Sequence, residues 1–242
     1  MRKLGVVAVG AAALGLTLAA WTRQPSPTQG GATISGKMKF TGTKPAMPKI
    51  DMSEEPKCKA KYQGVPTDEA VVVNANGTLG NVFVYAKSGL PASYQAAAPS
   101  GDVTLDQDGC RYHPHVLGIL VGQKLAIKNS DGILHNIKAK GTKNRPFNIS
   151  QPSVMSSDRT FTAPEVMVPL SSDIHPWMVA FVGVMSHPFF AITSSDGSFT
   201  IRGVPPGEYT VEAWHERFGS STRSATVEPG RSDATTFTFG NR

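Results

Sequence analysis

Two histidines and one methionine stand out as the residues in this sequence that could do chemistry. His175 and Met178 lie three residues apart in one short segment, and His135 lies forty residues upstream. Imidazole nitrogen and thioether sulfur form a soft donor set, which suits copper better than magnesium or calcium. We therefore predict that His135, His175 and Met178 bind a metal ion, and that the cofactor is copper.

A second pair of histidines lies upstream, in His113-Pro114-His115. In a strand, residues two apart point to the same face, although Pro114 interrupts that pattern. His115 is therefore an additional candidate ligand. The alternative is that both histidines are exposed loop residues with no ligand role.

The chain has two cysteines, Cys58 and Cys110. In an exported protein an even number of cysteines favours a disulfide. A bridge that closes a loop of this length stabilises a fold by about 4 kcal/mol in the chain-entropy description. The alternative is two metal ligands, which the absence of a Cys-x-x-Cys spacing disfavours. A disulfide sulfur is not a thiolate donor.

The N-terminus predicts export. Arg2 and Lys3 precede an apolar run from Leu4 to Ala20, which is typical of a signal peptide over residues 1–20. A retained membrane anchor is the alternative. Residues 21–31 are typical of a flexible linker. Cleavage of the signal peptide would leave a protein in the periplasm or cell envelope that is not membrane-embedded. The net charge of +6 would fall to +4 on loss of Arg2 and Lys3.

The rest of the pattern predicts an all-β protein. Ile34, Met38 and Phe40 alternate with lysines, and Tyr209 and Val211 alternate with polar residues, as in half-buried strands. An Asn-Gly turn at 76–77 predicts a hairpin between residues 71–73 and 81–87. No amphipathic helix of useful length is expected. Basic residues do not cluster with aromatic ones, so nucleic acid is not an expected partner.

Several of these segments together resemble a known superfamily. Val121-Gly122-Gln123, Asn129-Ser130-Asp131, His135-Asn136 and His175-Pro176-Trp177-Met178 resemble the cupredoxin (plastocyanin-like) superfamily, and most closely a group of exported bacterial cupredoxin-like proteins. The resemblance implies a Greek-key β-sandwich over residues 32–190.

The C-terminal part has a different resemblance. Asp196 to Phe199 and Val204 to Tyr209 are similar to a second small β-sandwich, the transthyretin or carboxypeptidase-regulatory-like module, here over residues 191–242. The segment near Ile34 also resembles the first strand of that module. The cupredoxin-like part is therefore a candidate insertion in the second sandwich.

The superfamily's ligands match His135, Ser172, His175 and Met178. In the family the second of these positions holds a Cys, whose thiolate makes blue-copper electron transfer work. Ser172 stands at this vacated thiolate position, and a protonated hydroxyl is a poor copper ligand. The sequence therefore predicts a copper site that is not a type 1 blue site.

These features lead to two hypotheses of different class. The first is an exported copper-binding protein for copper carriage or electron transfer, with a redox or copper-transfer protein as its partner. The second is a metal-free structural or recognition module of the envelope that binds protein or glycan. The chain shows no hydrolase or transferase motif, so an enzyme is not expected.

Overall fold

The computed structural model describes residues 32–97, 99–229 and 231–240. The expected signal peptide over residues 1–20 and the linker over residues 21–31 lie outside these ranges. Within the described ranges, no helix is long and apolar enough to cross a membrane.

Nearly all the regular secondary structure of the described residues is β-strand, which confirms the predicted all-β class. The elements are β1 (Ala32–Thr41), α1 (Pro56–Lys59), β2 (Phe83–Ser88), β3 (Val103–Asp108), β4 (Arg111–His113), β5 (Val116–Leu120), β6 (Lys124–Asn129), β7 (His135–Ala139), β8 (Phe147–Gln151), β9 (Met155–Thr160), β10 (Glu165–Ser171), β11 (Val179–Met185), β12 (Phe190–Ile192), β13 (Ser198–Val204), β14 (Gly207–His215), β15 (Gly219–Val227) and β16 (Asp233–Gly240).

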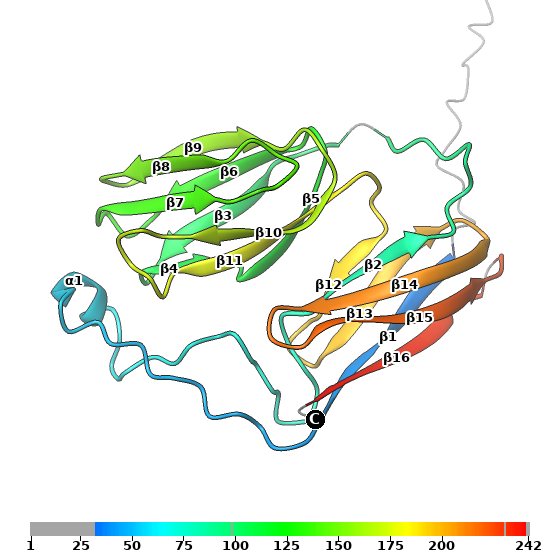
Figure 1. Cartoon of the computed structure of the whole chain (residues 1–242), viewed down its shortest axis with the longest axis horizontal. Helices are drawn as coiled ribbons and strands as arrows, with labels where there is room; N and C mark the ends of the chain where they lie inside the picture. Colours follow the sequence, from blue (N-terminus) through cyan, green and yellow to red (C-terminus); the bar gives the residue numbers. More distant parts are fainter. Residues whose placement is uncertain (1–31, 98, 230, 241–242) are drawn as a thin grey trace, which may run out of the picture.

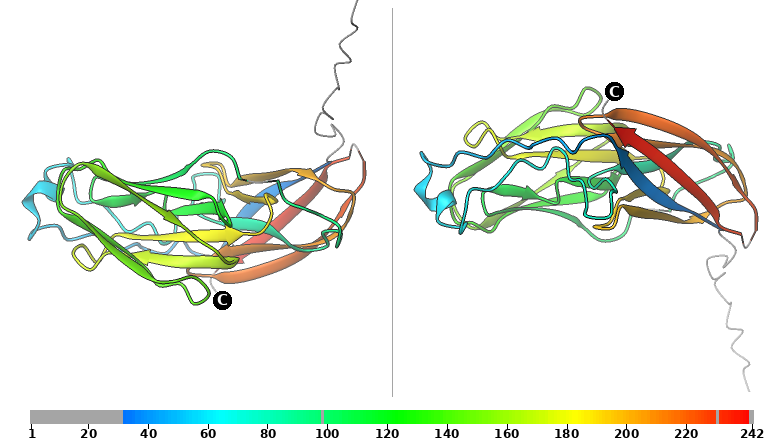
Figure 2. Two further views of the ribbon diagram at one scale, coloured as in Figure 1. Left: turned by 90° about the horizontal axis from the view of Figure 1, so that it is seen from above. Right: turned by 90° about the horizontal axis from the view of Figure 1, so that it is seen from below.

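The strands form four sheets that pack as two β-sandwiches (Figure 1). In the first, which we call the central sandwich, the sheet β5-β11-β10-β7-β8 faces the sheet β4-β3-β6-β9. In the second, the terminal sandwich, the sheet β13-β1-β16 faces the sheet β12-β2-β14-β15. The two sandwiches lie end to end in an elongated molecule (Figure 2).

Each sandwich encloses its own apolar core. In the central sandwich, Leu125 and Ile127 of β6 are buried in the same cluster as Val182 of β11. In the terminal sandwich, Ile34 of β1 and Val211 of β14 are buried in one cluster. The alternation seen in the sequence arises because one face of each strand turns toward such a core.

The terminal sandwich is built from three separate stretches of the chain, which hold β1, β2 and β12 to β16. β1 pairs parallel to β16 and antiparallel to β13, and β2 pairs with β14 and β12. The sheets therefore divide the chain differently from the expected boundary between residues 190 and 191. Strands β1 and β2 complete the C-terminal module, and the central sandwich lies between them and the C-terminal strands in sequence. Periodicity shows which face of a strand is buried, but it does not show which strand is the partner.

A long segment connects β1 to β2 along the outside of the molecule. We call residues 42–70 the strap; it reaches the far end of the central sandwich and carries α1 there (Figure 1). This helix is only four residues long, and the sequence pattern did not predict it. The predicted Asn-Gly turn does form, with the Gly77 amide donating to the Asn74 carbonyl at 3.0 Å. Within the described residues, a single bridge between Val73 and Leu79 spans this turn. The predicted partner strand, β2, pairs with β14 and not with residues 71–73.

Aromatic side chains fill the junction between the sandwiches. Phe83 of β2 stacks on Phe190 of β12, with ring centroids 5.5 Å apart. Phe181 of β11 packs on Trp214 of β14 at 5.0 Å. Glycines in the central sandwich make room for this cluster. A Cβ on Gly118 of β5 would lie 2.2 Å from the Phe190 ring.

We expect Gly118→Ala to destabilise the protein by about 1–3 kcal/mol, because the new methyl group forces the Phe190 ring out of its packed position. Gly64→Ala in the strap is the matched control, since its Cβ would meet nothing within 4 Å. Urea denaturation of both variants measures the difference. Equal stability of the two variants would show that the junction is loosely packed.

Candidate metal centre

The two histidines predicted as ligands come from adjacent parts of one sheet. His135 is the first residue of β7, and His175 lies in the loop of residues 172–178 that joins β10 to β11. β7 and β10 are antiparallel neighbours, with Ser171 opposite Lys138. This register places the start of β7 beside the loop that follows β10.

Hydrogen bonds from Ser172 fix the shape of the loop. The Ser172 amide donates to the Met178 carbonyl at 3.2 Å, which closes the loop at its base. The Ser172 hydroxyl donates to Asn136 Oδ1 at 2.7 Å and accepts from the His175 amide at 3.0 Å. It also accepts from the Ile174 amide at 3.1 Å. The serine oxygen thus anchors the backbone that presents His175.

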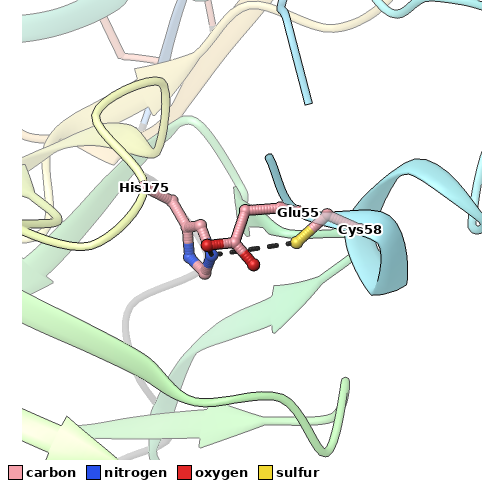
Figure 3. A group of neighbouring side chains, drawn as sticks. All are labelled: Glu55, Cys58 and His175. Carbon is pink, nitrogen blue, oxygen red and sulfur yellow. Dashed lines mark hydrogen bonds and ion pairs between the residues drawn. The ribbon is translucent and has the colours of Figure 1, made fainter. Parts of the chain in front are cut away.

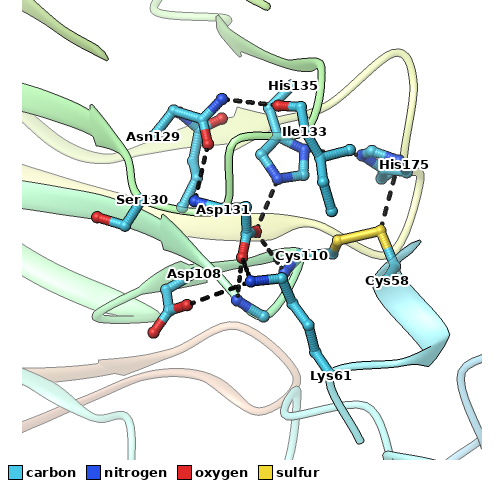
Figure 4. Close-up of polar contacts among 12 residues, drawn as sticks. Cys58, Lys61, Asp108, Cys110, Asn129, Ser130, Asp131, Ile133, His135 and His175 are labelled. Carbon is cyan, nitrogen blue, oxygen red and sulfur yellow. Dashed lines mark hydrogen bonds and ion pairs between the residues drawn. A yellow bond between two sulfur atoms is a disulfide. The ribbon is translucent and has the colours of Figure 1, made fainter. Parts of the chain in front are cut away.

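The two imidazole rings meet through the same nitrogen. His135 Nδ1 lies 3.0 Å from His175 Nδ1, and the ring planes are 74° apart (Figure 4). Both residues are fully buried. Residues forty positions apart in sequence therefore share one pocket, as the ligand prediction requires.

The opposite nitrogen of each ring faces a carboxylate. His135 Nε2 lies 2.8 Å from Asp131 Oδ2, and His175 Nε2 lies 3.6 Å from Glu55 Oε1 (Figure 3). A carboxylate beside one ring nitrogen favours the proton on that nitrogen and leaves the other as a lone pair. With protons on both outer nitrogens, two Nδ1 lone pairs turn toward one point.

The environment keeps Asp131 ionised and His175 neutral. Burial alone raises the pKa of the Asp131 carboxyl, but hydrogen bonds from His135, Lys61 and the Cys110 and Gly109 amides outweigh it and hold that pKa well below its usual range. Burial, followed by repulsion from His135, lowers the pKa of His175 despite the opposing effect of Glu55. A neutral imidazole is the form that binds metal.

The structure confirms the predicted Cys58–Cys110 disulfide and places it beside the histidines. The bond has an S–S length of 2.01 Å, and Cys58 Sγ lies 3.9 Å from His175 Nε2. Trp177 packs on the His175 ring with centroids 5.2 Å apart, and its indole nitrogen donates to the Cys110 carbonyl at 3.0 Å. The disulfide therefore ties the strap to the turn between β3 and β4, and Trp177 links that turn to the loop that carries His175.

The other predicted site residues lie in different surroundings. The Met178 side chain is fully buried within the core of the central sandwich, and its amide donates to the His175 carbonyl at 2.8 Å. His115 does not join the histidine pair. Its Nε2 contacts Glu216 Oε1 and its ring packs edge-on to Phe181, so it lies at the junction between the sandwiches.

Sequence reasoning did not assign a role to either carboxylate. Asp131 lies four residues before His135, in the Asn129-Ser130-Asp131 turn, and this spacing could have indicated its contact with the His135 ring. Glu55 lies three residues before Cys58, but nothing in the sequence places it near His175. Only the path of the strap brings it there.

The geometry suits a cation held between two nitrogens. Nitrogen–metal bonds of about 2.0 Å hold two ligand nitrogens about 3–4 Å apart, which includes the separation observed here. Carboxylates on the outer nitrogens orient metal-binding imidazoles in the same way in many proteins. A single proton shared between the rings is the other species that satisfies both lone pairs.

Comparisons with known sequences identify the C-terminal part of the chain. The sequence profile of the carboxypeptidase regulatory-like domain matches residues 182–240. This match agrees with the resemblance predicted for that part of the chain. No curated protein matches the sequence.

Several solved structures are similar to parts of the chain. They include a Cu-containing nitrite reductase (NirK) from Thermus scotoductus SA-01, with 23% identity, a TM-score of 0.33 and 40% of this chain covered. The match spans only 25% of that enzyme. A purple cupredoxin from Nitrosopumilus maritimus has 22% identity and a TM-score of 0.30, over 35% of this chain and 100% of that one. An oxidized mutant of amicyanin has 20% identity and a TM-score of 0.32, over 42% of this chain and 98% of that one.

We expect Ser172→Ala to destabilise the protein by about 1–3 kcal/mol, because the His175 amide loses its acceptor inside a buried loop. Ser153→Ala, at an exposed position, is the control. Chemical denaturation at neutral pH gives the two values. If Ser172→Ala proved as stable as Ser153→Ala, the serine hydroxyl would not be anchoring the loop.

Proposed function

We propose that this protein binds one copper ion between His135 and His175 and carries copper or an electron in the manner of a cupredoxin. The observation that supports the proposal is the convergence of the two Nδ1 atoms at 3.0 Å, with Asp131 and Glu55 beside the outer nitrogens. Met178 enters the proposal as the thioether ligand on its spacing from His175 alone, since its side chain lies in the core of the central sandwich.

The donor set favours copper over harder metals. Imidazole nitrogen suits copper, zinc, iron and nickel, and a thioether adds a preference for Cu(I). The Ser172 oxygen already makes three hydrogen bonds in the loop, so it supplies no strong ligand in place of a thiolate. We therefore propose a copper centre without the Cu–thiolate bond that gives a type 1 site its colour.

Export and a protein partner belong to the same proposal. The Cys58–Cys110 disulfide supports an oxidising compartment outside the cytosol, in keeping with the basic and apolar N-terminus. Leu134 and Ile174 precede the two histidines directly and are exposed by 46% and 36%. Large exposed apolar side chains next to a redox or metal site favour contact with a partner protein. We propose no catalytic activity.

Copper loading tests the ligand assignment. We expect the oxidised protein to take up one equivalent of copper, and His135→Ala and His175→Ala each to lose it, because one imidazole alone holds the ion weakly. His113→Ala, which removes an exposed histidine, should bind like the native chain. Metal analysis after gel filtration measures the uptake. Equal copper in all four proteins would rule out the site.

A second experiment tests the nature of the centre. We expect the copper-loaded native protein to lack an intense visible band, and Ser172→Cys to gain one, since a thiolate at that position would complete a type 1 donor set. Absorption spectroscopy of the two proteins provides the measurement, with Ser153→Cys as the control for an unrelated thiol. A colourless Ser172→Cys protein that still holds copper would contradict the cupredoxin-type arrangement.

A further inference from the structure

The disulfide lies between two imidazole–carboxylate pairs. On one side, Cys58 Sγ, a Glu55 carboxylate oxygen and a His175 ring nitrogen all lie within 4.8 Å of one another (Figure 3). On the other side, Cys110 Sγ, Asp131 and His135 meet the same criterion (Figure 4). Each sulfur therefore has one potential nitrogen ligand and one potential oxygen ligand beside it.

The oxidation state of the sulfurs decides whether they can bind metal. Sulfur in a disulfide is not a thiolate donor, whereas a free cysteine binds soft metals through its thiolate. A dithiol reductant breaks the Cys58–Cys110 bond by thiol–disulfide exchange. Two electrons and two protons pass to the protein sulfurs, and the reductant becomes a disulfide. A divalent ion then binds both thiolates and displaces the two protons.

We propose that reduction of Cys58–Cys110 creates a second metal site, made of Cys58, Cys110, His135 and His175. Two thiolates and two imidazoles form the tetrahedral Cys₂His₂ set that suits Zn²⁺ and, as a soft set, Cu(I). Asp131 and Glu55 lie next to the same ring nitrogens and provide negative charge beside the bound cation. The site is thus a latent one, which the disulfide masks.

This site shares both histidines with the copper site and adds the two cysteine sulfurs. The sulfur of Cys58 lies 3.9 Å from His175 Nε2, whereas His175 Nδ1 faces His135. Because one imidazole does not readily bind two ions, the two sites exclude each other. The site in the reduced chain needs no copper in the oxidised chain, so the inference does not rest on the proposed copper function.

The strap provides a way for a reductant to reach the buried sulfurs. Cys58 is fully buried, but Lys57 and Lys59 on either side of it are exposed. The α1 segment that carries it is one helical turn long, and few buried apolar side chains hold such a segment in place. Lys61 holds the end of this segment through its 2.5 Å ion pair with Asp131.

Cobalt binding to the full chain tests the proposal, because Co²⁺ replaces Zn²⁺ in thiolate sites and gives intense sulfur-to-metal absorption. We expect the oxidised chain to show no such band. The chain reduced with a phosphine, with two free thiols confirmed by titration, should gain the band with one equivalent of Co²⁺ and lose it to Zn²⁺. Cys58→Ser with Cys110→Ser should show no band in either state, and His113→Gln should behave like the native chain.

The test remains decisive if reduction loosens the fold. In that case Zn²⁺ should restore the thermal unfolding transition of the reduced chain, since metal that binds only the folded state stabilises it. A reduced chain that stays folded without a thiolate band, or stays unfolded with Zn²⁺, overturns the proposal. Copper uptake by the oxidised chain would survive that result, so failure here is distinguishable from failure of the copper site.

Discussion

The buried approach of two imidazole rings is the constraint on which the rest of the site depends. Two nitrogen lone pairs 3.0 Å apart repel each other unless a proton or a metal ion lies between them. The surrounding residues enforce this contact. Asp131 and Glu55 beside the outer nitrogens favour protons there, and the Ser172 loop holds His175 in place. The proposed copper ion, or a shared proton, would lie at this contact.

The strap and the disulfide connect this site to the fold. The strap leaves the terminal sandwich after β1, reaches the far end of the central sandwich and brings Glu55, Cys58 and Lys61 to the histidine pair and its Asp131 partner. The disulfide fixes it there by a covalent bond to Cys110. Since β1 and β2 both pair with C-terminal strands, the strap is anchored at its two ends in the terminal sandwich. The terminal sandwich thus contributes to the site only by anchoring the strap, and the candidate ligands His135 and His175 come from the central sandwich.

The Ser172 hydroxyl anchors the loop that presents His175. The hydroxyl accepts from two amides and donates to Asn136, so it fixes the backbone that presents His175. The nearby cysteines are tied in a disulfide and supply no thiolate in that state. The proposed copper centre therefore has no thiolate ligand while the disulfide is intact.

The sequence by itself determined the all-β class, the pairing of the only two cysteines and the likeness of the C-terminal part to a regulatory-like module. It also picked out His135 and His175, because each lies in a short motif whose residue spacing is visible in the sequence. The likeness of the segment near Ile34 to the first strand of that module already placed β1 with the C-terminal strands. Tertiary structure alone decided that β2 joins them, that Glu55 reaches His175, and that His115 pairs with Glu216 instead of the site. The physical reason is that periodicity and spacing encode which faces are buried and which residues share a turn. Strand partners and contacts between distant segments depend on how whole surfaces pack, and no local pattern specifies them.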